Sequence, residues 1–468
     1  MGDKLKEKAF WIALGDIAGR GLSFITSIYL ARTLGSEFYG LITVAISILG
    51  YATWSTDLGL NNIGTRETAK EPSKRIFRVL EVFRLKLFLG IIVLVGATLV
   101  VSMIEMGDIE KQVILGYLYS IIPYMVLLEW YYSGKQQFGK IALSKVLNGL
   151  FYFLLVVIMV ENMEDVTLVP VLYTVGVTVA ALTLGTFAIQ DKPFALPSRG
   201  VQIYPDLIKS SSILGLGQFF AQIVHLLPAI LIGAILSLKD AGLYGAAFRI
   251  VVVAMMIDRV FVNLLLPNLA SIWSIDPNTA KQKIGVVFRF AAAGGAFIAL
   301  ITAVGAEQII GLLYGPEYSA SVPLLQLLSV MIAVTFINSL FSFGLIATNK
   351  DREYFLATCF GGTISAIVIF SFAAFGDILL AAASVSIAEI IITSFTYFWF
   401  RKVAPLNYMR PVLVSYSAAL SLFFIFNWMP LPILVNTLLA GILFLGIIWW
   451  SGIIDREHYD WAKRKLTE

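Results

Sequence analysis

Charged side chains inside long apolar stretches are the residues of this sequence most able to do chemistry. Arg20 lies near the middle of the first apolar stretch, and Asp16 precedes it by one helical turn, so the two share one helix face. A charge at the centre of a bilayer costs about 2.5–3.5 kcal/mol, so it normally faces a cavity or a partner. Two interpretations stay open: an internal Asp16–Arg20 ion pair that orients the helix, or a cationic cavity wall.

The second half of the chain holds further basic residues of this kind. His225 stands three residues before Pro228, which would kink its helix, free a backbone carbonyl and provide a hinge. Arg249 lies in the outer half of its stretch, whereas Arg259 lies close to the cytoplasmic end, where a long side chain reaches the interface. We list His225, Arg249 and Arg259 as candidate cavity residues, with packing or snorkelling as the alternative.

Two acids are candidates for ion coupling. Glu389 lies near the centre of an apolar stretch and has no basic residue within one turn, so it could bind a proton or another cation. Its alternative role is to hydrogen-bond to neighbouring helices. Asp57 lies near the inner end of its stretch, as does Glu129, and an interfacial position is the alternative for both.

No catalytic, nucleotide-binding or metal-binding motif is recognised. The segment 134–141 resembles a phosphate-binding loop but lacks the Ser or Thr that would bind magnesium, and it joins two apolar stretches with no strand before it. The single cysteine, Cys359, allows no intrachain disulfide. The basic residues are spread over many connectors, which argues against a nucleic-acid partner. We therefore expect no enzymatic activity, no cofactor and no metal.

The elements that must position these residues are long apolar stretches. Apolar residues make up 59% of the 468 residues and charged residues 14%, against roughly 45–50% apolar in soluble domains. A helix that crosses a membrane needs about 20 mostly apolar residues. The sequence predicts an all-α integral membrane protein with about fourteen transmembrane helices, at 9–31, 39–60, 82–104, 112–134, 141–161, 166–188, 207–235, 240–268, 284–306, 320–346, 354–375, 378–400, 410–428 and 431–452.

The connectors between these stretches alternate in charge. One set, which includes the N-terminus with Lys4, Lys6 and Lys8, carries most of the Lys and Arg. The other set carries mainly acids or no charge. Because basic connectors stay on the cytoplasmic side, the alternation predicts a multi-pass protein of the cell membrane with both termini in the cytoplasm.

A weak internal repeat divides the chain. Tyr39-Gly40 opens the second stretch and Tyr244-Gly245 opens the eighth, an offset of 205 residues that also relates Arg20 to His225. Both dipeptides enter from the outside, which indicates parallel repeats related by an axis along the membrane normal. We expect a six-helix bundle at 1–188, a cytoplasmic linker at 189–206, a second six-helix bundle at 207–400, and two added helices with a tail at 401–468.

The start of the chain resembles a known family. Residues 30–40 read LARTLGSEFYG, followed by DLGL at 57–60 and RE at 66–67. This pattern is similar to the opening of polysaccharide-biosynthesis membrane proteins, the O-antigen (Wzx-type) flippases of the multidrug/oligosaccharidyl-lipid/polysaccharide flippase superfamily. The layout of about fourteen spans in two six-helix halves resembles that superfamily over the whole chain.

The resemblance implies a substrate and a route. Relatives are implied to move undecaprenyl- or dolichyl-diphosphate oligosaccharides from the cytoplasmic to the outer leaflet, through a V-shaped central cavity and alternating access. Basic residues lining the cavity would meet the diphosphate; Arg20 matches the first-helix arginine expected there, and Arg249 and Arg259 are candidate equivalents. The implied partners are membrane lipid, the polyprenyl-linked glycan, and glycosyltransferases or a polymerase of the same pathway.

Three functions therefore stand side by side. The first is a flippase for a lipid-linked oligosaccharide, in which a bidentate guanidinium suits a diphosphate. The second is a cation-coupled small-molecule or multidrug antiporter of the same fold, with Glu389 or Asp16 as its coupling site. The third is a membrane scaffold for glycosyltransferases that transports nothing.

Overall fold

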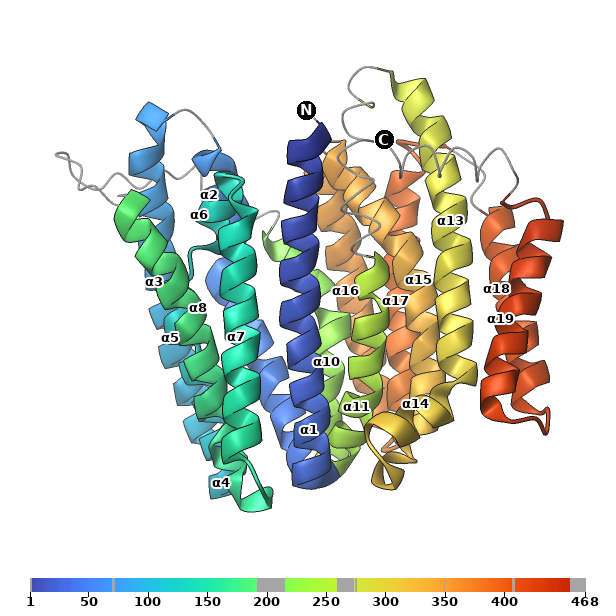
Figure 1. The fold of residues 1–468 in the computed structure, drawn as a ribbon, viewed down its shortest axis with the longest axis horizontal. Coiled ribbons are helices and arrows are strands. Elements are labelled where there is room, and N and C mark those ends of the chain that lie inside the picture. Colours follow the sequence, from blue (N-terminus) through green and yellow to red (C-terminus); the bar gives the residue numbers. More distant parts are fainter. Residues whose placement is uncertain are drawn as a thin grey trace. The chain divides into compact units, whose positions relative to one another are not determined.

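The computed structural model describes residues 2–69, 72–191, 215–258, 273, 276–348, 350–405 and 409–454 (Figure 1). All regular secondary structure in these ranges is helical. Contacts divide the chain into two compact units. Unit 1 comprises Met1–Gln222 and Ser237–Gly242, and unit 2 comprises Ile223–Leu236 and Leu243–Glu468. Arg259 and residues 192–206 of the expected linker lie outside the described residues.

Helix α1 (Gly2–Asp57) is broken at Gly35, whose φ of 73° and ψ of 173° are not helical. Its apolar part, Leu14–Asp57, is 44 residues long. At about 1.5 Å per residue it would measure roughly 66 Å, about twice the hydrocarbon thickness, if it were straight. The break falls between the two spans expected at 9–31 and 39–60.

The remaining helices of unit 1 follow in chain order. A short α2 and a long α3 are followed by three pieces, α4 to α6, that occupy the span expected at 112–134, and then by α7, a 3-10 turn η1 and α8. Their bounds are α2 (Leu60–Thr68), α3 (Pro72–Met103), α4 (Asp108–Tyr119), α5 (Ile121–Met125), α6 (Glu129–Gly134), α7 (Phe138–Met159), η1 (Met163–Thr167) and α8 (Val169–Asp191).

The span expected at 207–235 is bent. Its described part consists of a helix at Gly215–Ala221 and a second piece at Ile223–Leu236, with a bend of 47° between them. The second piece contains α10 (Ile223–Leu231) and a π-helical turn η2 (Ile232–Leu236). The boundary between the two units falls at this bend, between Gln222 and Ile223.

The other helices of unit 2 are mostly long and apolar. Helix α11 begins in unit 1 and continues in unit 2. Their bounds are α11 (Leu238–Ala254), α13 (Pro277–Val304), α14 (Ala306–Leu313), η3 (Pro316–Tyr318), α15 (Ser321–Ala347), α16 (Asp351–Ala373), α17 (Ile378–Phe400), α18 (Met409–Asn427) and α19 (Ile433–Trp450).

In the described residues, 12 helices are long and apolar enough to cross a membrane, or up to 13 if the bent pair forms one span. The prediction of an all-α, multi-pass membrane protein is therefore confirmed. The prediction of fourteen spans, the placement of both termini in the cytoplasm and the division into two six-helix bundles stay predictions.

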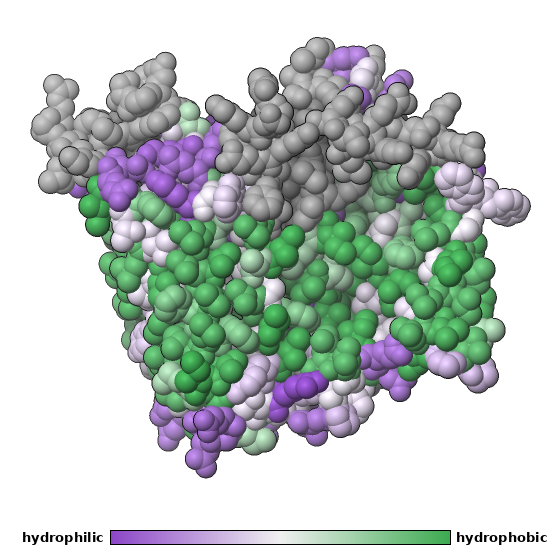
Figure 2. Space-filling model, in the orientation of Figure 1, coloured by the Kyte–Doolittle hydropathy of each residue, from purple (hydrophilic) through white to green (hydrophobic). Residues whose placement is uncertain are grey.

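The surfaces of the helices are suited to lipid. On α3, large apolar side chains such as Phe88, Ile91 and Leu99 are more than half exposed. Figure 2 shows hydrophobic side chains over the middle of the face in view and hydrophilic side chains along its lower edge. Contiguous apolar surface of this extent is costly in water, and in hydrocarbon it carries no such cost.

Candidate functional site

Small residues bring α1 and α7 into contact in unit 1. A Cβ atom added at Gly15 would lie 2.7 Å from the Cα of Ala142, and one added at Gly19 would lie 3.2 Å from the carbonyl oxygen of Lys145. Residues without a Cβ let two backbones approach closely. Gly15 and Gly19 therefore form a close packing face on α1, and this packing sets which charges can meet.

Asp16 pairs with a residue of α7 rather than with its neighbour in α1. The Nζ atom of Lys145 lies 2.7 Å from Oδ1 of Asp16, an ion pair with hydrogen-bonding geometry. The Asp16–Arg20 ion pair that the spacing allowed is not found. Within the described side chains, the guanidinium of Arg20 makes no ion pair or hydrogen bond.

A second acid lies beside the same ammonium. Oε2 of Glu129, at the start of α6, is 3.9 Å from Nζ of Lys145. No hydrogen bond to the Glu129 carboxylate is found among the described residues. The ammonium group of Lys145 therefore lies at hydrogen-bonding distance from Asp16 and farther from Glu129.

Lys86 of α3 extends the polar region toward the end of α1. Its side chain is 7% exposed, and its Nζ donates to Oδ1 of Asn61 over 3.2 Å. Oδ1 of Asp57 accepts the backbone N–H of Asn61 over 3.0 Å. Asp57 and Glu129 both act electrostatically on Lys86. The predicted coupling candidate Asp57 is thus buried beside a cation.

Lys86 and Lys145 were not singled out by sequence reasoning. Both lie four residues inside their expected spans, 82–104 and 141–161, where a basic residue resembles an ordinary cytoplasmic flank. Three acids of other spans, Asp16, Asp57 and Glu129, lie toward the side of their spans that is predicted to be cytoplasmic. These acids on the same side of the membrane are the signal that could have identified the two lysines as their partners.

Glu389 in unit 2 is held by uncharged donors. It is 3% exposed, and its Oε1 accepts the hydroxyl of Thr335 over 3.0 Å and the amide of Asn338 over 3.1 Å. Thr335 and Asn338 lie on α15, against which α17 packs. The arrangement matches the interhelical hydrogen bonds that were the alternative for this residue, and its role in coupling stays a prediction.

One polar stripe on α15 reaches two buried acids. Oδ1 of Asn338 accepts hydroxyls from Ser342 over 3.1 Å and from Thr396 over 2.9 Å. The hydroxyl of Ser339 donates to Asp258, which is also buried. Sequence reasoning missed the stripe, although polar residues at i, i+3, i+4 and i+7 in an apolar span are a helical face.

The other predicted residues of unit 2 lie on α10 and α11. His225 is on α10, and its ring centroid is 6.3 Å from that of Phe248. Pro228 is buried inside α10, and the 47° bend lies before it, at Gln222. Arg249 on α11 makes no ion pair or hydrogen bond with the side chains that the structure describes. The pairing of Arg20 with His225 by the repeat stays a prediction.

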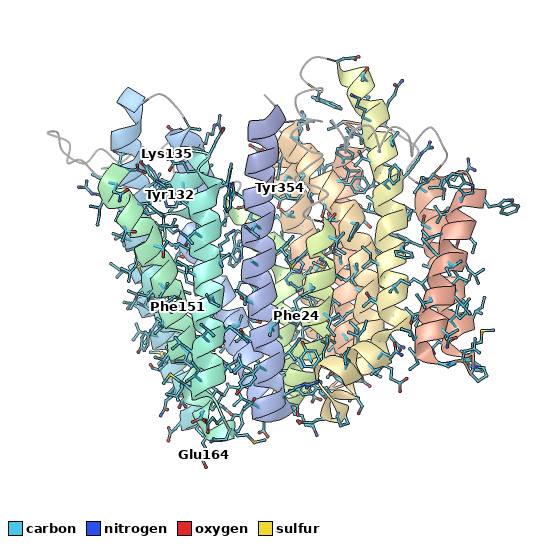
Figure 3. The ribbon with its side chains drawn as sticks, in the orientation of Figure 1. Phe24, Tyr132, Lys135, Phe151, Glu164 and Tyr354 are labelled. Atoms are coloured by element: carbon cyan, nitrogen blue, oxygen red, sulfur yellow. The ribbon has the colours of Figure 1, made fainter. Side chains whose placement is uncertain are left out.

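The loop-like segment 134–141 runs from the end of α6 into α7, with a turn at residues 135–137 (Figure 3). Nζ of Lys135 lies 3.1 Å from Oδ2 of Asp191 and 4.8 Å from the ring centroid of Tyr131. Partial burial alone would lower the pKa of Lys135. The hydrogen bonds to Tyr131 and Asp191 have the opposite and larger combined effect, so the pKa of Lys135 is raised. The segment is therefore a basic turn between two helices, without the preceding strand that a phosphate-binding loop requires.

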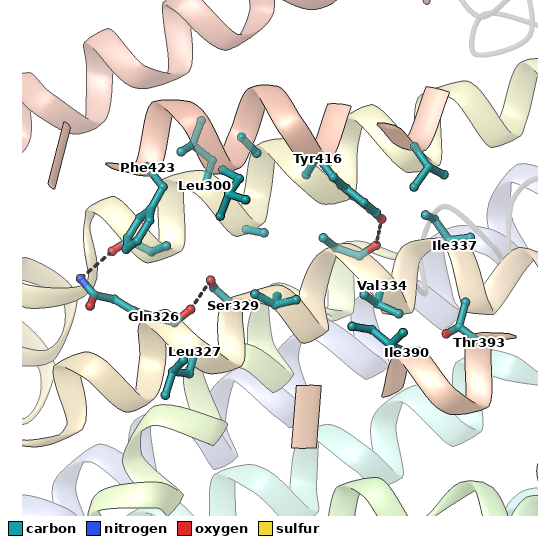
Figure 4. A pocket seen from close by; sticks show the side chains of 18 of the residues that line it. Leu300, Gln326, Leu327, Ser329, Val334, Ile337, Ile390, Thr393, Tyr416 and Phe423 are labelled. Carbon is teal, nitrogen blue, oxygen red and sulfur yellow. Dashed lines mark hydrogen bonds between the residues drawn. The ribbon is translucent and has the colours of Figure 1, made fainter. Parts of the chain in front are cut away.

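Unit 2 contains an apolar pocket of about 850 Å³ (Figure 4). Helices α13, α15, α17 and α18 line it. Its wall includes Leu300, Val330, Ile337, Leu420 and Phe423. The hydroxyl of Tyr416 donates a hydrogen bond to the carbonyl oxygen of Ala333 over 2.6 Å. That hydroxyl therefore adds no unpaired donor to its side of the pocket. A lining of this kind suits hydrocarbon.

The chain is similar in sequence to known proteins over much of its length. The family model described as "Polysaccharide biosynthesis protein" matches residues 5–273. A putative O-antigen transporter of Escherichia coli (strain K12) is 20% identical over 402 residues, covering 83% of this chain and 95% of that protein. The lipopolysaccharide biosynthesis protein WzxC of the same strain is 24% identical over 343 residues, covering 70% and 67%.

Solved structures share the fold. The lipid II flippase MurJ in an inward closed conformation gives a TM-score of 0.71 at 11% identity, covering 95% of this chain and 99% of that one. An inward-facing multidrug resistance transporter of the MATE family gives a TM-score of 0.63 at 13% identity, covering 85% and 96%.

Proposed function

Because the chain belongs to the polysaccharide biosynthesis protein family, we propose that it flips a lipid-linked oligosaccharide across the cell membrane. The substrate is an oligosaccharide on a polyprenyl diphosphate, and it moves from the cytoplasmic to the outer leaflet by alternating access. The relatives named as an O-antigen transporter and a lipopolysaccharide biosynthesis protein support this proposal.

The observation that carries the proposal is the apolar pocket of unit 2. Its volume of about 850 Å³ lies within the range of roughly 300–1,000 Å³ that is typical of ligand sites. Four helices with almost entirely apolar lining offer a place for part of a prenyl chain. Independently of this pocket, Arg20 of unit 1 is the candidate contact for a diphosphate, because a guanidinium can bind two phosphate oxygens at once.

The proposal includes a topology. The break at Gly35 makes two spans of α1 and the bent pair makes one, which gives about fourteen spans of sufficient length. An even number of spans puts both termini on one side, and the basic connectors favour the cytoplasmic side.

A reconstituted flipping assay tests the function. Purified protein in vesicles is expected to move a fluorescent polyprenyl-diphosphate oligosaccharide, and Val330→Trp, which fills the pocket, is expected to slow the initial rate at least about tenfold, or 1.4 kcal/mol. The matched control is Leu438→Trp on α19, because Leu438 is 59% exposed and lines no part of the pocket. Absence of flipping by the unaltered protein, or an unchanged rate in Val330→Trp, would contradict the proposal.

A cation-coupled multidrug antiporter is the second candidate. The fold shared with a MATE transporter and the buried Glu389 favour it. This candidate predicts that the protein confers drug resistance on a sensitised host and that Glu389→Gln abolishes the resistance. A scaffold for glycosyltransferases, the third candidate, predicts glycan assembly that depends on the protein without any flipping in vesicles.

A further inference from the structure

The helix Gly215–Ala221 of unit 1 packs one face against the junction of α1 and α2. A Cβ atom added at Gly215 would lie 2.2 Å from the carbonyl carbon of Leu58 and 2.3 Å from its oxygen. Two backbones therefore meet there, as a residue without a side chain allows. Gln218 and Phe219 follow Gly215 by three and four positions, so they share its helix face.

Two amide side chains meet on this face. Nδ2 of Asn62, an exposed residue of α2, donates to Oε1 of Gln218 over 3.1 Å. A carboxamide has two N–H donors and one carbonyl acceptor. Among the described residues neither side chain makes another hydrogen bond. The pair therefore keeps the N–H groups of Gln218 and the carbonyl oxygen of Asn62 for a ligand.

An aromatic pair lies on the same face. The ring centroid of Phe219 is 5.6 Å from that of Tyr51 in α1, with the ring planes tilted by 56°. Both residues are half-buried, so part of each ring stays accessible. The Tyr51 hydroxyl makes no hydrogen bond with the described residues. We call Asn62, Gln218, Tyr51 and Phe219 the amide–aromatic patch.

The charged groups in this region are already engaged. Lys86 is 7% exposed, and its ammonium donates to Oδ1 of Asn61. Asp57 is buried and accepts the backbone N–H of Asn61. A phosphate would need a free cation, and a cationic drug would need a free acid. The amide–aromatic patch therefore suits an uncharged polar ligand.

Sugars have the chemistry that the patch offers. A sugar hydroxyl both donates and accepts hydrogen bonds, as a carboxamide does. The C–H faces of a sugar ring are apolar and can pack on an aromatic face. Gln218 and Tyr51 lie inside the spans expected at 207–235 and 39–60. Lipid tails are a poor neighbour for them, because an amide without a hydrogen-bond partner costs about 2–7 kcal/mol in an apolar medium.

We propose that the amide–aromatic patch binds sugars of the lipid-linked oligosaccharide. This inference rests on the proposed function, and it assigns the glycan to residues other than Arg20, the candidate contact for the diphosphate. The two amides exchange hydrogen bonds with sugar hydroxyls, and the rings of Tyr51 and Phe219 pack on an apolar sugar face. A polyprenyl diphosphate without sugar makes none of these contacts.

Equilibrium binding to the purified full-length protein in detergent tests the inference. The probes are the polyprenyl-diphosphate oligosaccharide of the flipping assay and the same polyprenyl diphosphate without sugar. The unaltered protein should bind the glycosylated lipid at least about tenfold more tightly. Asn62→Ala should lose most of this ratio and bind the bare lipid as before, because it removes only hydrogen bonds to hydroxyls. Equal affinities of the unaltered protein for the two lipids would overturn the inference.

Tyr51 allows the ring and the hydroxyl to be tested separately. Tyr51→Leu removes the ring and should lower the ratio of the two affinities, whereas Tyr51→Phe keeps the ring and should preserve most of the ratio. The matched control is Gln112→Leu, which removes an exposed amide of α4 and should change neither affinity. A ratio that is unchanged in both Asn62→Ala and Tyr51→Leu, or that falls equally in Gln112→Leu, contradicts the inference.

Transport in vesicles separates this inference from the proposed function. If binding depends on the sugar and on Asn62 as expected but vesicles show no flipping, the proposed function fails and the glycan site stands. If the protein flips the glycosylated lipid but the substitutions leave the ratio of affinities unchanged, the proposed function stands and the glycan site fails.

Discussion

Gly40 and Gly242 cross with their backbones in contact. A Cβ atom on Gly40 would lie 1.7 Å from the carbonyl oxygen of Leu238, and one on Gly242 would lie 1.8 Å from that of Ser36. Both residues belong to unit 1, although Gly242 lies on α11, which continues into unit 2. The contact is a small-residue crossing of two helices, and it fixes the start of α11 against α1.

Substitution at this crossing should destabilise unit 1. In Gly40→Ala the new methyl group must separate two backbones, so we expect a cost at or above the roughly 1–3 kcal/mol of ordinary overpacking. Thermal unfolding of the detergent-solubilised protein measures it. The matched control is Gly96→Ala on α3, where nothing lies within 4 Å of the added atom. Equal melting temperatures for the two variants would rule out the close crossing.

Asn338 should matter more for stability than its single uncharged side chain suggests. It donates to Glu389 and accepts from Ser342 and Thr396, so Asn338→Leu removes three hydrogen bonds. Glu389 then keeps only the hydroxyl of Thr335, and losing one of two donors to a buried carboxylate should cost about 1–3 kcal/mol. Chemical unfolding would measure the loss. Ser394→Ala is the control, because its hydroxyl bonds only within its own helix, to Ile390. A loss no larger than that of the control would contradict the role of the network.

The helices could be predicted from the sequence because hydrocarbon demands long apolar segments. The break at Gly35 also falls between two of the expected spans. Those predictions need only composition and spacing along one helix. The division of the span expected at 112–134 into α4, α5 and α6 could not be predicted, because a helix broken into pieces has the same composition as a continuous one.

The partners of the charges could not be predicted from the sequence. Whether Asp16 meets Arg20 or Lys145 depends on how α1 and α7 are set against each other, and spacing within α1 favours Arg20. Asn338 and Glu389 are 51 residues apart, so their contact depends on the packing of α15 on α17. The sequence could identify which residues need a partner but not which partner each one takes.

The proposed topology predicts opposite labelling of two positions in unit 1. Lys135 and Glu164 lie at opposite ends of its helices (Figure 3). In a background in which Cys359 is replaced by Ser, a cysteine at position 164 should react with a membrane-impermeant maleimide in whole cells. A cysteine at position 135 should react only after permeabilisation. The reverse pattern would put the N-terminus outside.

Arg20 should be required for flipping, and its geometry should matter as well as its charge. We expect Arg20→Ala to lower the flipping rate by at least about tenfold, or 1.4 kcal/mol, because a diphosphate would lose its guanidinium. Arg20→Lys should restore the rate only in part, since an ammonium cannot bind two oxygens in parallel. The vesicle assay measures both, with Arg352→Ala, at an exposed position in the first turn of α16, as the control. Unchanged flipping in Arg20→Ala would remove this residue from the mechanism.

Gly35 should tolerate no side chain. Its φ of 73° with ψ of 173° falls in a region that is essentially restricted to glycine, where another residue costs of order 1–3 kcal/mol. Gly35→Ala should therefore lower the unfolding temperature even if the methyl group finds space. Gly185→Ala is the comparison, because it has open space around the added atom and an ordinary helical backbone, so helix propensity should make it neutral or slightly stabilising. A Gly35→Ala protein as stable as Gly185→Ala would mean that α1 turns without this strained residue.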